Sequence, residues 1–172
     1  FTLFPFESDL LNREGVSANF TGHPLAEIFE LNPDKDKAKE NMGLNIDKKY
    51  IALLPGSRKS EIKYHMGLFL EVANNFREKY PDLKFILALT NETKFDENLL
   101  LNYTNIILKK GESRKVLVSS DYALVASGTA SLEALLSKTP HCVVYRSNPV
   151  SNFILSRLLN INFISLPNIL AK

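Results

Sequence analysis

The sequence predicts an α/β fold, because apolar runs of strand length alternate along the chain with segments of helical periodicity. These runs are apolar throughout, as strands are when helices cover both faces of a parallel sheet. Hydrophobic residues make up 45% of the 172 residues and charged residues 23%, the balance of a folded domain and not of a disordered tail. The predicted architecture is therefore a doubly wound, mostly parallel, Rossmann-like sheet.

The regular part of the pattern begins at Tyr50. The expected strands are, in order, Tyr50–Leu54, Lys84–Leu89, Asn105–Leu108, Tyr122–Ala126, Cys142–Tyr145 and Phe163–Leu166. The clearest helix between them spans Ser60–Lys79, where apolar side chains recur on one face. Those side chains are Ile62, Met66, Phe69, Leu70, Ala73 and Phe76.

The first 49 residues follow a less regular pattern. An apolar run at Thr2–Phe6 is followed by an expected turn of helix and a short strand at Asn19–Thr21, and Pro24 is well placed to start another helix. The segment Asn32–Lys49 is dense in Lys and Asp, which indicates a solvated helix and connector. The chain opens on Phe1 directly in an apolar run, so we expect it to be part of a longer one.

Composition excludes several classes of function. The 21 Lys and Arg residues against 19 Asp and Glu give a net charge of +2, too even for a general nucleic-acid-binding surface. A single cysteine cannot form an internal disulfide, and no Cys/His cluster has metal-ligand spacing, so no metal is expected. We expect no cofactor either. The uncharged stretch Leu158–Ala171 is too short and too interrupted by Asn and Pro for a membrane span.

The first candidate site is the loop that follows the Tyr50–Leu54 run. Gly56 would let the backbone approach a ligand closely, and Ser57 and Ser60 are competent helix caps. Arg58 carries a planar fork of donors that suits a phosphate. An ordinary strand-to-helix turn with exposed cations explains the same residues, so composition leaves both interpretations open.

The second candidate site is Ser127–Glu133, which follows the Tyr122–Ala126 run. Small residues around Gly128 would bare backbone N–H groups at a helix start, and Thr129 adds a hydroxyl. Glu133 lies one turn further along the same face as Thr129, where it could accept hydrogen bonds from sugar hydroxyls. The helix start around Gly128 and the Glu133 carboxylate together predict a site for a nucleoside diphosphate. A glycine turn with a good cap gives the same pattern.

Other features predict less. No G-x-G-x-x-G, P-loop lysine, H-E-x-x-H or G-x-S-x-G is present, which argues against the enzyme classes that carry them. His23 is interpreted as shaping a turn, His65 as a half-exposed packing residue, and Cys142 as a core residue and not a nucleophile. The apolar face of Val150–Leu159 is assigned to core or interface packing ahead of a membrane surface.

Several short stretches, taken together and in order, cover nearly the whole chain. They are Phe4–Glu7, Gly22–Leu25, Leu54–Arg58, Ser127–Glu133, Tyr145–Arg146 with Asn148–Pro149, and Leu166–Asn168. In this combination the chain resembles the C-terminal half of the lipid-A-disaccharide synthases, glycosyltransferases of the two-domain GT-B type. The resemblance implies that residues 1–32 join a preceding N-terminal domain. It also implies that residues 33–172 form a nucleotide-sugar-binding domain that lacks its C-terminal end.

The resemblance also implies a reaction. Such an enzyme transfers 2,3-diacylglucosamine from UDP-2,3-diacylglucosamine to 2,3-diacylglucosamine 1-phosphate with inversion and without a metal, and it releases UDP. The loops at 56–58 and 127–133 would hold the diphosphate and ribose, and Asn168 would line the site. The general base is expected in the preceding domain, so no catalytic acid or base is assigned to this chain.

Partners and location follow from the same resemblance. The lipid substrates imply a cytoplasmic protein in peripheral contact with the inner face of the inner membrane. A homodimer of the full-length protein is one possibility, and the sequence leaves the oligomeric state open. Two other functions stay open. A UDP-sugar 2-epimerase shares the Ser-Gly-Thr…Glu loop, and the isolated domain could bind UDP without any activity of its own.

Overall fold

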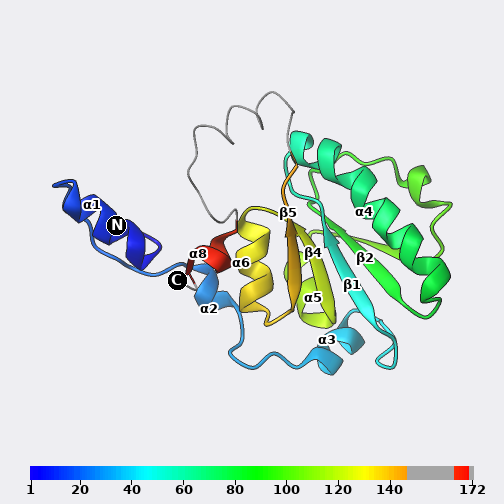
Figure 1. Cartoon of the computed structure of the whole chain (residues 1–172). Helices are drawn as coiled ribbons and strands as arrows, with labels where there is room; N and C mark the ends of the chain where they lie inside the picture. The colour runs from blue at the N-terminus through cyan, green and yellow to red at the C-terminus, as the bar shows by residue number, and fades with distance from the viewer. Residues whose placement is uncertain (147–164, 171–172) are drawn as a thin grey trace. The chain divides into compact units, whose positions relative to one another are not determined.

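The computed structural model describes residues 1–146 and 165–170. Contacts within the chain divide it into two compact units, Phe1–Pro33 and Asp34–Lys172. The second unit contains every strand of the sheet described below, and Figure 1 shows its helices around that sheet.

The sheet is parallel and has the strand order β3-β2-β1-β4-β5. The strands are β1 (Tyr50–Leu54), β2 (Lys84–Leu89), β3 (Ile106–Lys110), β4 (Tyr122–Ala126) and β5 (His141–Val144). Each neighbouring pair is parallel, with Leu53 opposite Leu87 on one side and Leu124 on the other. Strand order reverses between β1 and β4. The carboxyl ends of these two strands are therefore the topological switch point, where such sheets bind ligands. The predicted fold class is therefore confirmed.

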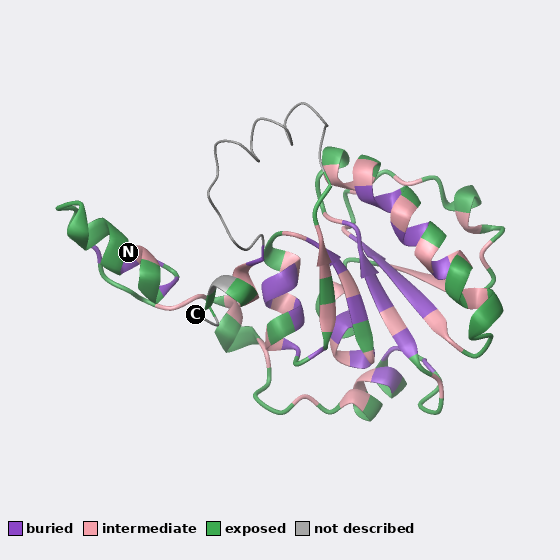
Figure 2. Cartoon of the chain, viewed as in Figure 1, coloured by how far each residue is buried: buried purple, intermediate pink, exposed green. Residues whose placement is uncertain are grey.

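Helices cover both faces of the sheet. Helix α4 (Lys59–Lys79) packs on one face, where Phe69 and Ala73 meet Leu53 and Phe85 in a buried cluster. Helices α3 (Lys35–Asn41), α5 (Ser113–Ser119) and α6 (Thr129–Leu136) belong to the other face. Figure 2 shows the resulting burial along the strands and the inner side of α4.

The side chains of each strand point alternately to the two faces of the sheet. Tyr50, Ala52 and Leu54 of β1 belong to the cluster beneath α3, α5 and α6, whereas Leu53 belongs to the cluster beneath α4. Successive side chains of a strand point to opposite faces, so a run that is apolar throughout is what a doubly covered sheet requires. A short 3-10 helix, η1 (Glu97–Leu100), connects β2 to β3.

The first unit contains α1 (Pro5–Arg13), α2 (Leu25–Ile28) and one parallel bridge between Thr2 and Phe20. Proline stands at the first position of α1, where its missing N–H costs no helical bond. The Glu7 carboxylate accepts the N–H groups of Leu3 and Phe4, both at 3.0 Å. The helix start expected at Pro24 is confirmed, because α2 follows it directly.

The structure corrects two details of the sequence interpretation. Leu166 begins helix α8 (Leu166–Leu170), so the strand expected at Phe163–Leu166 is wrong where the residues are described; 163–164 lie outside them. Cys142 is exposed and not a core residue, because β5 has a neighbour on one side only among the described strands. The segment Val150–Leu159 lies outside the described residues.

Candidate nucleoside diphosphate site

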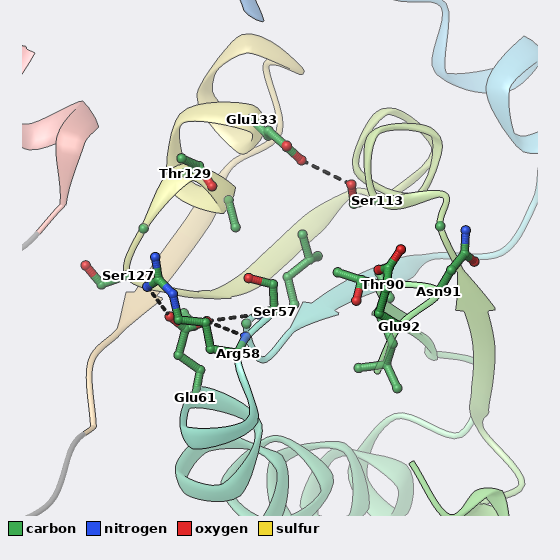
Figure 3. Close-up of a pocket in the computed structure, with 18 of the residues that line it drawn as sticks. Ser57, Arg58, Glu61, Thr90, Asn91, Glu92, Ser113, Ser127, Thr129 and Glu133 are labelled. Carbon is green, nitrogen blue, oxygen red and sulfur yellow. Dashed lines mark hydrogen bonds and ion pairs between the residues drawn. The ribbon is translucent and has the colours of Figure 1, made fainter. Parts of the chain in front are cut away.

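A cavity of about 520 Å³ lies at the carboxyl ends of the central strands. Its size falls in the range of small-molecule sites, roughly 300–1,000 Å³. Most of its wall comes from the segments that follow β1, β2, β3 and β4, and one residue comes from α8 (Figure 3). The polar and glycine residues lining it are Gly56, Ser57, Arg58, Glu61, Thr90, Asn91, Glu92, Gly111, Ser113, Ser127, Gly128, Thr129 and Glu133.

The start of α6 presents free backbone donors to this cavity. Gly128 precedes the helix with φ 150° and ψ −157°, a conformation that is almost restricted to glycine. Within the described residues, the N–H groups of Thr129 and Ala130 have no hydrogen-bond acceptor. The Ser131 hydroxyl donates to the Gly128 carbonyl at 2.7 Å. Free N–H groups and the positive end of the helix dipole together favour an anion at this position.

The start of α4 differs from the prediction, because its backbone donors already have a partner. The Glu61 carboxylate accepts the N–H of Ser57 at 2.9 Å and that of Arg58 at 3.2 Å. Neither Ser57 nor Ser60 caps the helix, whose N-cap residue is Arg58. The amides near Gly56 therefore hold an internal carboxylate, and the expectation that Ser57 or Ser60 would cap this helix is wrong.

Arg58 is the cation that this loop offers to a ligand. One of its guanidinium nitrogens lies 2.9 Å from Oε1 of Glu61, and its side chain is 81% exposed. Figure 3 shows Arg58 on the side of the cavity where Ser127 and Thr129 lie, with Glu61 below it. A guanidinium has five N–H donors, so its bond to Glu61 leaves donors for a phosphate.

Glu61 is held in its charged form by these contacts. Burial raises the pKa of its carboxyl, but the N–H groups of Ser57 and Arg58 and the Arg58 guanidinium outweigh burial and bring the pKa below its ordinary value. Hydrogen bonds and a nearby cation both favour the ionised carboxylate. The ionised Glu61 carboxylate therefore holds the loop in place. The sequence did not predict this role for Glu61.

Glu133 lies further along α6 and faces the same cavity. Its Oε2 accepts a hydrogen bond from the Ser113 hydroxyl at 3.2 Å, shown as a dashed line in Figure 3. This bond joins α6 to the start of α5, 20 positions earlier in the chain. A carboxylate can accept about four hydrogen bonds, so the contact with Ser113 leaves room for sugar hydroxyls.

The wall beyond β2 was not predicted. Thr90, Asn91 and Glu92 line the cavity, and Figure 3 places them on the side away from Arg58. The Asn91 side chain lies against Gly111, where a Cβ would come within 2.7 Å of it. These residues form no recognised sequence motif, and only the position of β2 beside β1 brings them to the site.

His65 was expected to be a half-exposed packing residue, and this expectation is wrong. Its side chain is buried, with only 3% of the residue exposed. Nδ1 lies 3.1 Å from the Pro55 carbonyl, and Nε2 accepts the N–H of Arg146 at 3.0 Å. Since Nε2 is an acceptor, the proton of the neutral ring lies on Nδ1 and is donated to Pro55. The ring thereby links the loop after β1 to the residues that follow β5.

The structure brings together all but one of the residues predicted for the site. Gly56, Ser57, Arg58, Ser127, Gly128, Thr129 and Glu133 line the one cavity. Asn168 does not, although Leu166 of the same helix does; its Oδ1 accepts a hydrogen bond from Ser165 at 2.8 Å. The part of the chain that the structure describes contains no group of His, Cys, Asp or Glu suited to a metal ion.

Comparison with known proteins gives a family for this arrangement. A family model described as "Lipid-A-disaccharide synthetase" matches residues 1–172. The chain belongs to this family. The lipid-A-disaccharide synthase of Idiomarina loihiensis is 41% identical over 98% of the chain, and that of Aeromonas hydrophila is 35% identical over 97%. The enzyme of the same name from Escherichia coli O157:H7 is 37% identical over 97%.

The match covers these relatives only in part. The chain spans 46% of the Idiomarina protein and 45% of the other two, so it corresponds to about half the length of the curated family members. Among the described residues, no helix is both long enough and apolar enough to cross a bilayer.

Proposed function

We propose that this chain is the UDP-sugar-binding half of a glycosyltransferase of lipid A biosynthesis. The full-length protein would transfer 2,3-diacylglucosamine from UDP-2,3-diacylglucosamine to 2,3-diacylglucosamine 1-phosphate and release UDP. The observation that supports this most strongly is that Arg58, the start of α6 and Glu133 share one cavity at the switch point of the sheet. Family membership supports the choice of substrates.

The diphosphate and the ribose of a nucleoside diphosphate each have a chemically suitable counterpart in the cavity. The diphosphate carries the negative charge, which suits the free N–H groups of Thr129 and Ala130. The Arg58 guanidinium suits phosphate oxygens through its planar donors. Glu133 suits the ribose, because a carboxylate only accepts hydrogen bonds and a sugar hydroxyl can donate them.

The same groups would accelerate the transfer. Negative charge builds on the diphosphate as the bond between the sugar and UDP breaks. Donors that are already aimed at this position stabilise the transition state more than the ground state. Arg58 would act in this way, while the base that activates the acceptor hydroxyl would come from the part of the protein that precedes this chain.

We further propose where the full-length protein works. Its two substrates carry acyl chains, so it would be a cytoplasmic protein that contacts the inner face of the inner membrane peripherally. A homodimer of the full-length protein is part of the same proposal. Flotation with anionic vesicles would test the membrane contact, and analytical ultracentrifugation would test the homodimer.

An activity assay of the full-length protein tests the proposed reaction. We expect UDP release only when UDP-2,3-diacylglucosamine and 2,3-diacylglucosamine 1-phosphate are both present, with the disaccharide 1-phosphate as product. UDP-N-acetylglucosamine serves as the comparison substrate, since a 2-epimerase would convert it without any lipid acceptor. Conversion of that sugar nucleotide, with no disaccharide from the lipid pair, would overturn the proposal in favour of an epimerase.

A further inference from the structure

We propose that Ser113 is a positioning residue for Glu133 and, through it, makes the site prefer ribose to deoxyribose nucleotides. This inference rests on the proposed function, because it assumes that Glu133 faces the pentose of a bound nucleotide. Ser113 is the first residue of α5, and Glu133 lies in the second turn of α6. Both line the cavity and both are half-buried.

The Ser113 hydroxyl has no other structural role among the described residues. The residue that precedes α5 as its N-cap is Glu112, and no side chain caps that helix. The hydrogen bond to Glu133 Oε2, at 3.2 Å, is the contact that the Ser113 side chain makes within the described part of the chain. A polar side chain turned into a ligand cavity and bonded only to another cavity residue is suited to orienting that residue.

Glu133 needs such orientation. Its carboxylate has no other hydrogen-bond partner in the described residues, and a glutamate side chain that is ordered only on ligand binding loses much rotamer freedom. The Ser113 bond fixes the carboxylate before the ligand arrives, which lowers the ordering cost of binding. One acceptor position is used by Ser113 and the others stay available.

The ligand group that fits this arrangement is a vicinal diol. The 2′ and 3′ hydroxyls of ribose can both donate to a single fixed carboxylate, whereas a deoxyribose offers one hydroxyl fewer. A carboxylate that turns freely could follow either sugar, but a fixed one is matched to the diol. The preference for ribose should therefore depend on the Ser113 hydroxyl as well as on Glu133.

Calorimetric titration of the chain with UDP and with 2′-deoxy-UDP tests this. For Ser113→Ala we expect UDP affinity to fall about 3- to 10-fold, the usual size of one lost hydrogen bond, with a smaller change for 2′-deoxy-UDP. Ser113→Thr keeps the hydroxyl and should retain most of the UDP affinity. Ser60→Ala is the control, because Ser60 is an exposed serine in the first turn of α4 that does not line the cavity.

A double-variant cycle separates positioning from a direct contact. If Ser113 acts through Glu133, then adding Ser113→Ala to Glu133→Ala changes UDP affinity no further. Equal losses for UDP and 2′-deoxy-UDP, or an undiminished loss in the Glu133→Ala background, would overturn the inference and leave the proposed function intact. Failure of the unaltered chain to bind UDP at all would instead overturn the assigned role of the site, and this inference with it.

Discussion

Gly56 and Glu61 lie so close together that any side chain at position 56 would displace the carboxylate. A Cβ built on Gly56 would be 2.5 Å from Glu61 Oε2 and 2.6 Å from Glu61 Cβ. The glycine therefore makes room for a residue of its own chain. That residue in turn holds the backbone of Ser57 and Arg58, so the shape of the loop and the placement of its arginine depend on this one contact.

Replacing Gly56 with alanine should destabilise the fold. The backbone at Gly56 has φ +114°, which is strained for any other residue, and the new Cβ would also clash with Glu61. We expect a loss of about 2–3 kcal/mol in the free energy of unfolding, measured with urea. Gly67→Ala is the control: a Cβ there meets nothing within 4 Å, and alanine in a helix should add about 0.5–1 kcal/mol. Equal effects of the two substitutions would contradict the role of the Gly56–Glu61 contact.

Acid should weaken the loop through Glu61. Because the folded pKa of Glu61 lies below its ordinary value of 4.5, its ionised form contributes stability above pH 4.5. That contribution is lost as the pH falls through the folded pKa. Glu61→Gln should therefore flatten the dependence of unfolding free energy on pH as the pH falls below 4.5. An acid dependence identical to that of the unaltered chain would contradict this role.

Asp121 holds the opposite end of the sheet together. It accepts the N–H of Tyr50 at 3.0 Å and lies 3.6 Å from Nζ of Lys39, whose side chain is only 3% exposed. Burial raises the pKa of Asp121, but the Tyr50 N–H and the lysines Lys49, Lys35 and Lys39 bring it below its ordinary value. Without the Asp121 carboxylate, the buried Lys39 ammonium would lose the charge that balances it and keep the carbonyls of Ile46 and Lys48 as hydrogen-bond partners.

Asp121→Asn should therefore lower the free energy of unfolding by about 3 kcal/mol, while UDP binding by the folded protein persists. Urea unfolding and calorimetry measure the two quantities. Asp82→Asn is the matched control, since Asp82 pairs with Lys48 on the surface, where ion pairs contribute little. A loss of UDP affinity without a loss of stability would be inconsistent with a purely structural role for Asp121.

Arg58 should matter for the reaction more than for the fold. In the full-length enzyme, Arg58→Ala should lower kcat/KM. The corresponding loss of transition-state stabilisation should be about 2–4 kcal/mol, as expected for the loss of one preorganised donor. Lys59→Ala removes one positive charge from the neighbouring position, but Lys59 does not line the cavity. Steady-state kinetics should show a much smaller effect for Lys59→Ala. Unchanged kcat/KM in Arg58→Ala would refute the assigned role.

Sequence alone predicted the positions of the main strands and helices, and the site residues that lie close together within one loop. The apolar run of β1 and the one-sided pattern of α4 follow directly from burial on a sheet covered twice, so their positions were predicted to within a residue or two. Ser127–Thr129 were recognisable because the glycine and the helix start that follows lie within a few residues of each other. Such signals need no knowledge of the tertiary structure.

The unpredicted features depend on contacts between distant segments. His65 meets Arg146, 81 positions later, and nothing in a helical pattern shows that its ring would be buried there. Ser113 and Glu133 belong to different helices, and only the strand order brings them together. Cys142 was expected to be buried because its run is apolar, but burial in a sheet also depends on which strand lies at the edge.

A crystal structure of the chain with bound UDP tests most directly whether the switch-point cavity is the nucleotide site. We expect the diphosphate within hydrogen-bond distance of the Thr129 and Ala130 N–H groups and of the Arg58 guanidinium, and the ribose hydroxyls against Glu133. Glu61 should stay on the amides of Ser57 and Arg58. A nucleotide bound outside this cavity, or a diphosphate that displaces Glu61 while the start of α6 remains empty, would contradict the assignment.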